Sequence, residues 1–477
     1  MARYKPYDYR QRVLLPVSLE DQLLPGTLEF AIHTLVEKWL DMSIFESKYR
    51  NDETGRAAYD PKVLLKVVLL AYSRGLISSR KIEQACRENV VFMALACGQQ
   101  PDHSTIATFV SSMKDEILPL FRDVLLVCEE MNLLGGTMFA LDGCKLPSNA
   151  SKEWSGTLAE LRKKKEKIET RVAQLLEEQL QTDQRQDDPP GPQVAGANRQ
   201  RQVEKLQRKA ELIETWLAEN QPKLGAAGRE KQSNITDNDS ATMMTCHGAV
   251  QGYNSQALID AKHQVIVHGE AFGDGQDHGH GPGYFKGKVF TADSNYHTQV
   301  NLQECQQLGL DAYIPDRKFR NRDPRFATQK WRQMRRYTLK DFHYDEVLDQ
   351  YICPHGKVLK LRAKEVLDHG HLYRKYLATE KDCQTCPLRA QCIYGAGAKR
   401  KHLSVPVGIS LSKQMVEKIE TAQGRRIYPQ RLAIAEPVFA NIRVNKRLDR
   451  FTLRTKIKVN IQWLLYCLIH NIEKILN

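Results

Sequence analysis

The sequence has no apolar run that approaches the roughly 20 residues a bilayer-spanning helix needs. Its first residues, MARYKPYDYR, lack the apolar core of a signal peptide. Its 11 cysteines are an odd number scattered over 477 residues, which is not the pattern of a disulfide framework. These absences argue against a membrane-spanning protein and against a disulfide-stapled secreted one, and we expect a cytoplasmic protein.

Positive charge, by contrast, is abundant. The chain has 70 Lys and Arg against 57 Asp and Glu, a formal net charge of +13 and a pI near 9.1. This balance favours a polyanionic partner, with nucleic acid as the first candidate. The length fits roughly two to four domains, and a hydrophobic content of 42% is enough to fill their cores.

The N-terminal part, residues 27–125, has the apolar spacing of several short helices. Asp60 followed by Pro61 is a typical helix start, and Asp102 or Ser104 caps another helix. Short helices joined by tight turns are typical of a helix-turn-helix DNA-binding module, and equally of a plain structural bundle. Both interpretations stay open.

Apolar residues recur at helical spacing on both sides of a Pro-Gly segment, QDDPPGPQVAGANR. The region from 158 to 217 is therefore predicted to be a helical hairpin with a flexible tip. Its lysine run, RKKKEK, is either a contact for a phosphate backbone or a solvated face.

Two aspartates follow short apolar runs that are predicted to be strands. TMFALDGCKL is interpreted as a strand that ends at Asp142-Gly143, and KVFTAD as one that ends at Asp293. After Asp293, SNYHTQVNLQECQQLG has a capped helical start and a glycine stop, and LDAYIPD is another strand. Together they predict a β-α-β unit, whose strand ends are where open α/β sheets bind ligands.

A third acid, Glu436, lies just before a helical pattern in a basic neighbourhood, and Pro437 suggests that it caps that helix. Convergent carboxylates bind Mg²⁺, and paired metals activate an attacking oxygen at a phosphodiester. Each acid also has a structural interpretation. Asp142 stands before a glycine, which is typical of a turn. Asp293 could cap a helix, and Glu436 could form a surface ion pair with Arg431.

Three segments together, FALDGCKLPSNAS, KVFTADSNYH and YPQRLAIAEPVFANIR, resemble the DDE transposases of bacterial insertion sequences. The likeness is to the group whose third acid lies in a Y-R-E-K signature, and it covers nearly the whole chain. It implies an α/β fold with an RNase H-like mixed sheet core, Mg²⁺ or Mn²⁺ as cofactor, and a bacterial, nucleoid-associated enzyme.

By motif, the resemblance makes Asp142, Asp293 and Glu436 the catalytic, metal-binding acids. Tyr428 and Arg431 match the tyrosine and arginine of the signature, although the spacing from Arg431 to Glu436 is one residue longer than the commonest form. Arg443 stands seven residues after Glu436, where the signature has lysine. Arginine keeps the charge for phosphate but presents its donors differently. On a helix, Arg443 would share the face of Glu436.

A basic segment, residues 316–336, holds nine Lys or Arg against two Asp, with Phe319, Phe326 and Trp331 interleaved. Such a segment suits a phosphate backbone and unstacked bases, or is a solvated loop. We single out four of its residues as DNA contacts: Arg317, Lys318, Arg320 and Trp331.

Four cysteines cluster downstream, and they are Cys353, Cys383, Cys386 and Cys392. Their spacing is compatible with a tetrahedral zinc site in a reducing compartment and also with unligated thiols. The histidines in GDGQDHGHGPG are interpreted as part of a Gly-rich loop rather than as metal ligands.

The expected domains are a helical DNA-binding region, 1–130, and an RNase H-like catalytic region, 135–477. A helical hairpin, 151–235, and a basic, Cys-containing segment, 319–425, interrupt the second region. Expected partners are double-stranded DNA, as the terminal inverted repeats and the target, and a second copy of the chain in a homodimer, with no membrane. The alternatives are a domesticated DNA-binding protein that does not cleave and a metal-dependent DNA nuclease.

Overall fold

The computed structural model describes residues 18–49, 57–184, 194–225, 228–245, 248–273, 286–322, 337–368, 371–393, 397–407 and 411–476. They form a mixed α/β protein with a helical N-terminal region, as predicted. The chain divides into two compact units. The first combines Met1–Asp277 with Arg431–Asn477, and the second is His278–Gln430. The domain boundaries expected from the sequence stay predictions.

Short helices fill the N-terminal region of the first unit, and two of the predicted helix starts are confirmed. Asp60 accepts a hydrogen bond from the Lys62 amide at 2.7 Å, and Asp102 accepts from the Ser104 amide at 2.9 Å. These bonds satisfy amides that the first helical turn leaves unpaired. The elements are η1 (Glu20–Gln22), α1 (Leu28–Lys38), η2 (Met42–Lys48), α2 (Pro61–Ser73), α3 (Ser79–Glu88), α4 (Val90–Leu95), α5 (His103–Ser112) and α6 (Ile117–Glu130).

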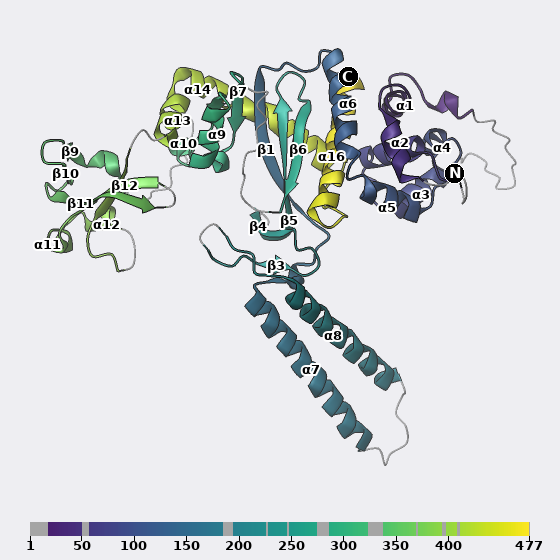
Figure 1. Cartoon of the computed structure of the whole chain (residues 1–477), viewed down its shortest axis with the longest axis horizontal. Helices are drawn as coiled ribbons and strands as arrows, with labels where there is room; N and C mark the ends of the chain where they lie inside the picture. Colours follow the sequence, from purple (N-terminus) through teal and green to yellow (C-terminus); the bar gives the residue numbers. More distant parts are fainter. Residues whose placement is uncertain are drawn as a thin grey trace, which may run out of the picture. The chain divides into compact units, whose positions relative to one another are not determined.

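The strands of the first unit pair with one another in antiparallel fashion (Figure 1). They include β1 (Met138–Pro147), β4 (Ala241–Thr245), β5 (Gly248–Asp260) and β6 (Ile266–Phe272), with β5 paired to the other three. The apolar C-terminal helix α16 (Lys456–Leu476) packs on β6 and α6. Trp463 of α16 donates its indole N–H to the Gln256 carbonyl at 3.0 Å. Gly269 permits this approach, since a Cβ there would lie 3.0 Å from Sγ of Cys467.

The predicted helical hairpin is confirmed. Its helices, α7 (Leu158–Gln184) and α8 (Val194–Glu219), lie side by side in Figure 1. Two apolar clusters join them, one around Leu161 and Ile213 and the other around Leu175 and Val203. At the base, η3 (Lys152–Trp154) precedes the short pair β2 (Ser155–Gly156) and β3 (Ser233–Asn234). Of the Pro-Gly segment predicted to form a flexible tip, residues 186–193 lie outside the described part, and residues 194–199 belong to α8.

The second unit contains the predicted β-α-β element, which is confirmed. Strands β7 (Val289–Ala292) and β8 (Asp311–Tyr313) pair in parallel, and α9 (Gln299–Gln307) lies between them in sequence. The α-helix begins later than the sequence suggested, because Thr298 is its cap. The residues after β7 instead form the 3-10 turn η5 (Ser294–Tyr296).

The remainder of the second unit has an antiparallel sheet and several short helices. The sheet order is β13-β12-β11-β10-β9. The strands are β9 (His343–Asp345), β10 (Gln350–Ile352), β11 (Val358–Asp368), β12 (His371–Leu377) and β13 (His402–Pro406). The helices are α10 (Phe319–Arg322), η7 (Leu339–Asp341), α11 (Glu380–Gln384), α12 (Arg389–Cys392), α13 (Leu411–Glu420) and α14 (Ala422–Ile427).

None of the described helices combines the length and apolar character that crossing a bilayer would require.

Candidate active site

Asp142 lies in the middle of β1, so the prediction that it ends a strand is wrong. The strand continues to Pro147, and Asp142 is paired with Ala257 of β5. The following Gly143 suggested a turn, but its role is close packing within the sheet. A Cβ at Gly143 would lie 3.0 Å from Oδ1 of Asn254. The missing side chain therefore lets β5 approach, and a rigid strand interior fixes the position of Asp142.

Arg431 forms an ion pair with Asp142. Its Nη1 lies 2.6 Å from Oδ2, and the two side chains are only 10% and 18% exposed. The other oxygen of Asp142, Oδ1, accepts from the Gly143 amide at 2.9 Å. The alternative drawn from the sequence, a surface pair between Arg431 and Glu436, is therefore wrong. Arg431 instead neutralises the negative charge of Asp142 on β1.

Glu436 lies inside a helix and does not cap it, as the sequence had suggested. The helix α15 (Gln430–Ala440) starts six residues earlier and contains Pro437 in its interior. Proline has no N–H, so the carbonyl four residues back, that of Ala433, loses its helical partner. Nε2 of Gln264 donates to this carbonyl at 2.9 Å. This side-chain bond explains how the helix passes through a proline beside Glu436.

Asp142 and Glu436 line one hollow of about 660 Å³ in the first unit. Arg443 reaches it from the π-helix η8 (Asn441–Asn445), which follows α15, and not from a regular α-helix as predicted. Carboxylate oxygens suit a divalent cation, and arginine suits a phosphate. The full lining is Asp142, Gly143, Cys144, Glu436, Phe439, Ala440, Arg443, Val444, Arg447 and Asp449.

Thiolate chemistry is not expected in this hollow. Burial raises the pKa of the Cys144 thiol to about 12. Cys144 therefore stays protonated near neutral pH and is neither a nucleophile nor a metal ligand in that form. The acids and the arginines remain as the reactive groups.

Asp293 belongs to the second unit, where it directly follows β7, as predicted. Its Oδ1 accepts from the Asn295 amide at 2.8 Å, and Oδ2 accepts from the Asn295 side chain at 3.1 Å. Asp293 therefore lies at a strand end and also caps η5, so both interpretations of this residue describe it. That it joins Asp142 and Glu436 stays a prediction.

The basic segment of the second unit is divided between surface and core. Arg317, Lys318 and Arg320 are exposed, as DNA contacts would have to be. Phe319, by contrast, is buried and packs edge-on against Tyr428, with ring centroids 5.2 Å apart. Phe319 is therefore a core residue and not a stacking platform for bases. Phe326 and Trp331 lie outside the described residues.

The four clustered cysteines line one small cavity of the second unit. Sγ of Cys353 accepts from the Lys357 amide at 3.2 Å, and Sγ of Cys383 accepts from the Lys401 amide at 3.5 Å. Cys386 and Cys392 complete the group. Nevertheless, no three or more Cys, His, Asp or Glu side chains among the described residues are arranged to hold a metal ion. The histidine-containing GDGQDHGHGPG loop falls largely outside those residues.

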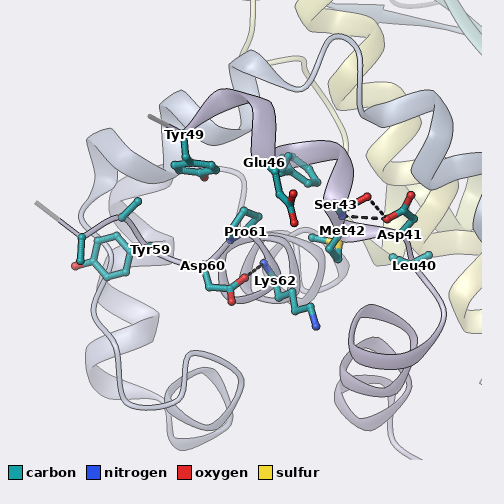
Figure 2. A pocket seen from close by; sticks show the side chains of 13 residues that line it. Leu40, Asp41, Met42, Ser43, Glu46, Tyr49, Tyr59, Asp60, Pro61 and Lys62 are labelled. Carbon is teal, nitrogen blue, oxygen red and sulfur yellow. Dashed lines mark hydrogen bonds between the residues drawn. The ribbon is translucent and has the colours of Figure 1, made fainter. Parts of the chain in front are cut away.

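A further hollow lies between η2 and the start of α2 (Figure 2). Three of its lining side chains are carboxylates, Asp41, Glu46 and Asp60. Figure 2 shows two of them turned to the backbone, where Asp41 binds the Ser43 amide and Asp60 binds the Lys62 amide. Negative charge repels phosphate, so this hollow does not suit a DNA backbone.

Two residues that line the hollow with Asp142 and Glu436, Arg447 and Asp449, were not singled out in the sequence. Both follow the glutamate helix in the run VNKRLDR. Lysines and arginines number 70, so charge alone does not distinguish one of them. Only the folded structure shows that Arg447 lines this hollow.

Two family models match the chain. The model described as "Transposase domain (DUF772)" matches residues 17–112, which include α1 to α5. The model described as "Transposase DDE domain" matches residues 352–476, which include Glu436 and Arg443. No curated protein matches.

Among solved structures, the chain is similar to one described as a cryo-EM structure of the piggyBac transposase synaptic complex with hairpin DNA. The identity is 10%, the match covers 94% of this chain and 74% of that one, and the TM-score is 0.29. The two family matches, one near each end of the sequence, support a DNA transposase with a DDE domain, a domain that indicates an enzyme acting on DNA.

Proposed function

We propose that this transposase cleaves DNA at the ends of its insertion sequence and joins the freed 3′-hydroxyl to target DNA. One observation carries the proposal. Asp142 and Glu436, which come from distant parts of the sequence, line one hollow together with Arg443. Reaction at a phosphodiester needs carboxylates that bind a divalent cation and a positive side chain that binds phosphate, and this hollow contains both.

Asp142, Asp293 and Glu436 are the proposed ligands of Mg²⁺ or Mn²⁺. Their oxygens are hard donors of the kind these cations prefer, and two of the three share a hollow with room for substrate. When bound, the cations supply activation of the attacking oxygen and stabilisation of the leaving one. The placement of Asp293 beside the other two acids is part of the proposal.

The basic residues have separate proposed tasks. Arg443 binds a phosphate of the DNA inside the hollow, and Arg431 orients Asp142 through their ion pair. Tyr428, Arg317, Lys318, Arg320 and Trp331 are the proposed DNA contacts of the second unit. Support for the three charged members of that set is their exposure, because a cation must reach solvent to meet a phosphate.

The proposed partners are the terminal inverted repeats, the target DNA and a second copy of this chain. The helical region, 1–130, is the proposed reader of the repeats. The hairpin α7–α8 is the proposed dimer interface, since leucines on its outer faces are solvent-exposed. These are Leu176 at 39%, Leu180 at 61% and Leu212 at 47% exposure.

A structural zinc ion on Cys353, Cys383, Cys386 and Cys392 is also proposed. Its support is the cavity that the four residues share and the two amides that donate to their sulfur atoms. Amide donors of this kind stabilise thiolates. The side chains would have to turn toward one another to reach tetrahedral ligation.

The decisive experiment is a Mg²⁺-dependent cleavage and joining assay on labelled DNA that carries the element's own end. The wild type is compared with Glu436→Gln, which keeps the size of the side chain and removes its charge. Joined product from the wild type and none from the variant is the expected result. Cleavage without joining would indicate a nuclease, and binding without cleavage a domesticated DNA-binding protein.

A further inference from the structure

Arg447 adopts a left-handed backbone conformation, with φ at +55°. For a residue with a Cβ, this conformation is sparsely populated and strained, and glycine and asparagine adopt it most readily. Such strain persists only where the surroundings impose it. An arginine at this position therefore raises the question of what its side chain does.

Both neighbours of Arg447 are fixed in the core. Lys446 is 1% exposed, and its Nζ lies 2.6 Å from Oε2 of Glu473. Leu448 is fully buried, and its amide donates to the Ile442 carbonyl at 3.2 Å. With the residues on each side directed inward, the chain turns Arg447 outward.

The stem of Arg447 is held as well. It lies against Gly75, at the C-terminal end of α2, where an added Cβ would be 3.0 Å from Cδ of Arg447 and 3.1 Å from its Cβ. Gly75 itself has a φ of +71°. The glycine therefore leaves space for this arginine stem, and the stem is packed although the residue is exposed overall.

Arg447 lines the same hollow as Asp142, Glu436 and Arg443. Two nearby cations are already engaged, since Arg431 pairs with Asp142 and Lys446 with Glu473. For Arg447, no ion pair forms with any carboxylate of the described residues. Arg447 thus brings to the hollow a positive charge that no carboxylate of the described residues pairs with.

We propose that Arg447 is a second phosphate-binding residue of the active site, which binds a phosphate of the DNA strand held over Asp142 and Glu436. The planar fork of an arginine matches two oxygens of a phosphate. A binding role explains why a strained position holds arginine, whereas a purely structural turn would favour glycine. The inference rests on the proposed DNA cleavage for the identity of its ligand.

The test compares Arg447→Gly, Arg447→Lys and Arg447→Gln with the wild type. Lys262→Gln is the matched control, because it removes one exposed positive charge outside the hollow. Three quantities are measured: the thermal midpoint, the affinity for a labelled duplex of the element's end across a salt series with EDTA, and the Mg²⁺-dependent cleavage rate.

Arg447→Gly is expected to keep or raise the thermal midpoint, because glycine relieves the strain. For this variant, the slope of log DNA affinity against log salt concentration should become shallower by about 0.9, which is the change expected when one phosphate contact is lost. Its cleavage rate should fall on the order of tenfold or more. Arg447→Lys should recover part of both binding and rate, Arg447→Gln should recover neither, and Lys262→Gln should cleave like the wild type.

A wild-type salt slope and cleavage rate in Arg447→Gly would overturn the proposal, and so would a loss of cleavage that only follows a lower thermal midpoint. The salt series contains no divalent cation, so it separates this inference from the proposed function. If the wild type binds but does not cleave, the proposed function fails, while the slope of Arg447→Gly still decides whether Arg447 binds phosphate.

Discussion

Nη1 of Arg431 lies 2.6 Å from Oδ2 of Asp142, although 289 positions separate the two residues in sequence. Both side chains are largely buried. Removal of either partner of such a partly buried pair destabilises the folded protein, because the remaining partner becomes an uncompensated charge.

Arg431→Met and Asp142→Asn are therefore each expected to lower the free energy of unfolding, by about 1 to 3 kcal/mol. The double variant should cost less than the sum of the two, because it leaves neither charge alone. Urea unfolding of the four proteins gives this comparison. Additive losses would mean that the pair does not couple in solution.

Asp293→Asn separates the metal role of Asp293 from its capping role. Asparagine is as good a helix cap as aspartate, so the thermal midpoint should change little. Loss of the carboxylate should abolish Mg²⁺-dependent cleavage while DNA affinity stays at the wild-type level. The cleavage assay and a binding titration on the same labelled DNA measure both effects. Full cleavage by this variant would remove Asp293 from the proposed triad.

Gln264 replaces the helical partner that Pro437 denies to the Ala433 carbonyl. In the wild type, Gln264→Met should lower the free energy of unfolding by about 1 kcal/mol, the typical contribution of such a hydrogen bond. In a Pro437→Ala background the backbone amide gained at that position takes the carbonyl, and the same change should cost clearly less. Denaturant titrations of this cycle are the measurement. Equal costs in both backgrounds would show that the bond does not compensate for the proline.

His470 of α16 predicts a loss of stability in acid. Burial lowers its pKa from 6.5 to about 3, and the nearby positive charges of Lys446 and Lys474 act in the same direction, against the hydrogen bond to the Gln264 carbonyl. Between these two values the unfolded chain binds a proton that the folded protein does not. Stability from this residue is therefore complete above about pH 6.5 and falls as the pH decreases toward 3.

For one such group, the free energy of unfolding falls by about 1.4 kcal/mol for each pH unit below pH 6.5. The accumulated loss is about 2 kcal/mol at pH 5. His470→Gln should flatten the decline between pH 7 and pH 5. Unfolding titrations of both proteins across this range give the comparison, and because other groups titrate too, the difference between the curves is what counts. Parallel curves would mean that His470 is protonated in the folded state.

The zinc ion that we propose for the four clustered cysteines implies bound zinc in protein purified without chelator. Cys386→Ser should lower the zinc content and the thermal midpoint together, because a structural metal contributes to folding stability. Cys97→Ser is the control, since Cys97 is exposed and lies outside the cavity. Elemental analysis of the three proteins gives the zinc content. A metal-free wild type with four titratable thiols would leave the cavity as an ordinary apolar contact.

Local patterns in the sequence determined the secondary structure well where the signals act over a few residues. Asp60 and Pro61 start a helix because capping and a fixed proline φ are local effects. The same holds for the hairpin helices α7 and α8 and for the β-α-β unit around Asp293. The three acids were selected by motif order, and Asp142 and Glu436 do line one hollow.

The tertiary structure decided what local signals could not. Gly143 looked like a turn because the sequence does not show that Asn254 needs its empty side-chain space. Pro437 looked like a helix start because the compensating donor, Gln264, comes from a different part of the chain. Long-range contacts override local propensity in both cases, since a satisfied backbone in a packed core is worth more than a local preference. The partner of Arg431 and the outward turn of Arg447 were decided in the same way, by contacts between segments far apart in the sequence.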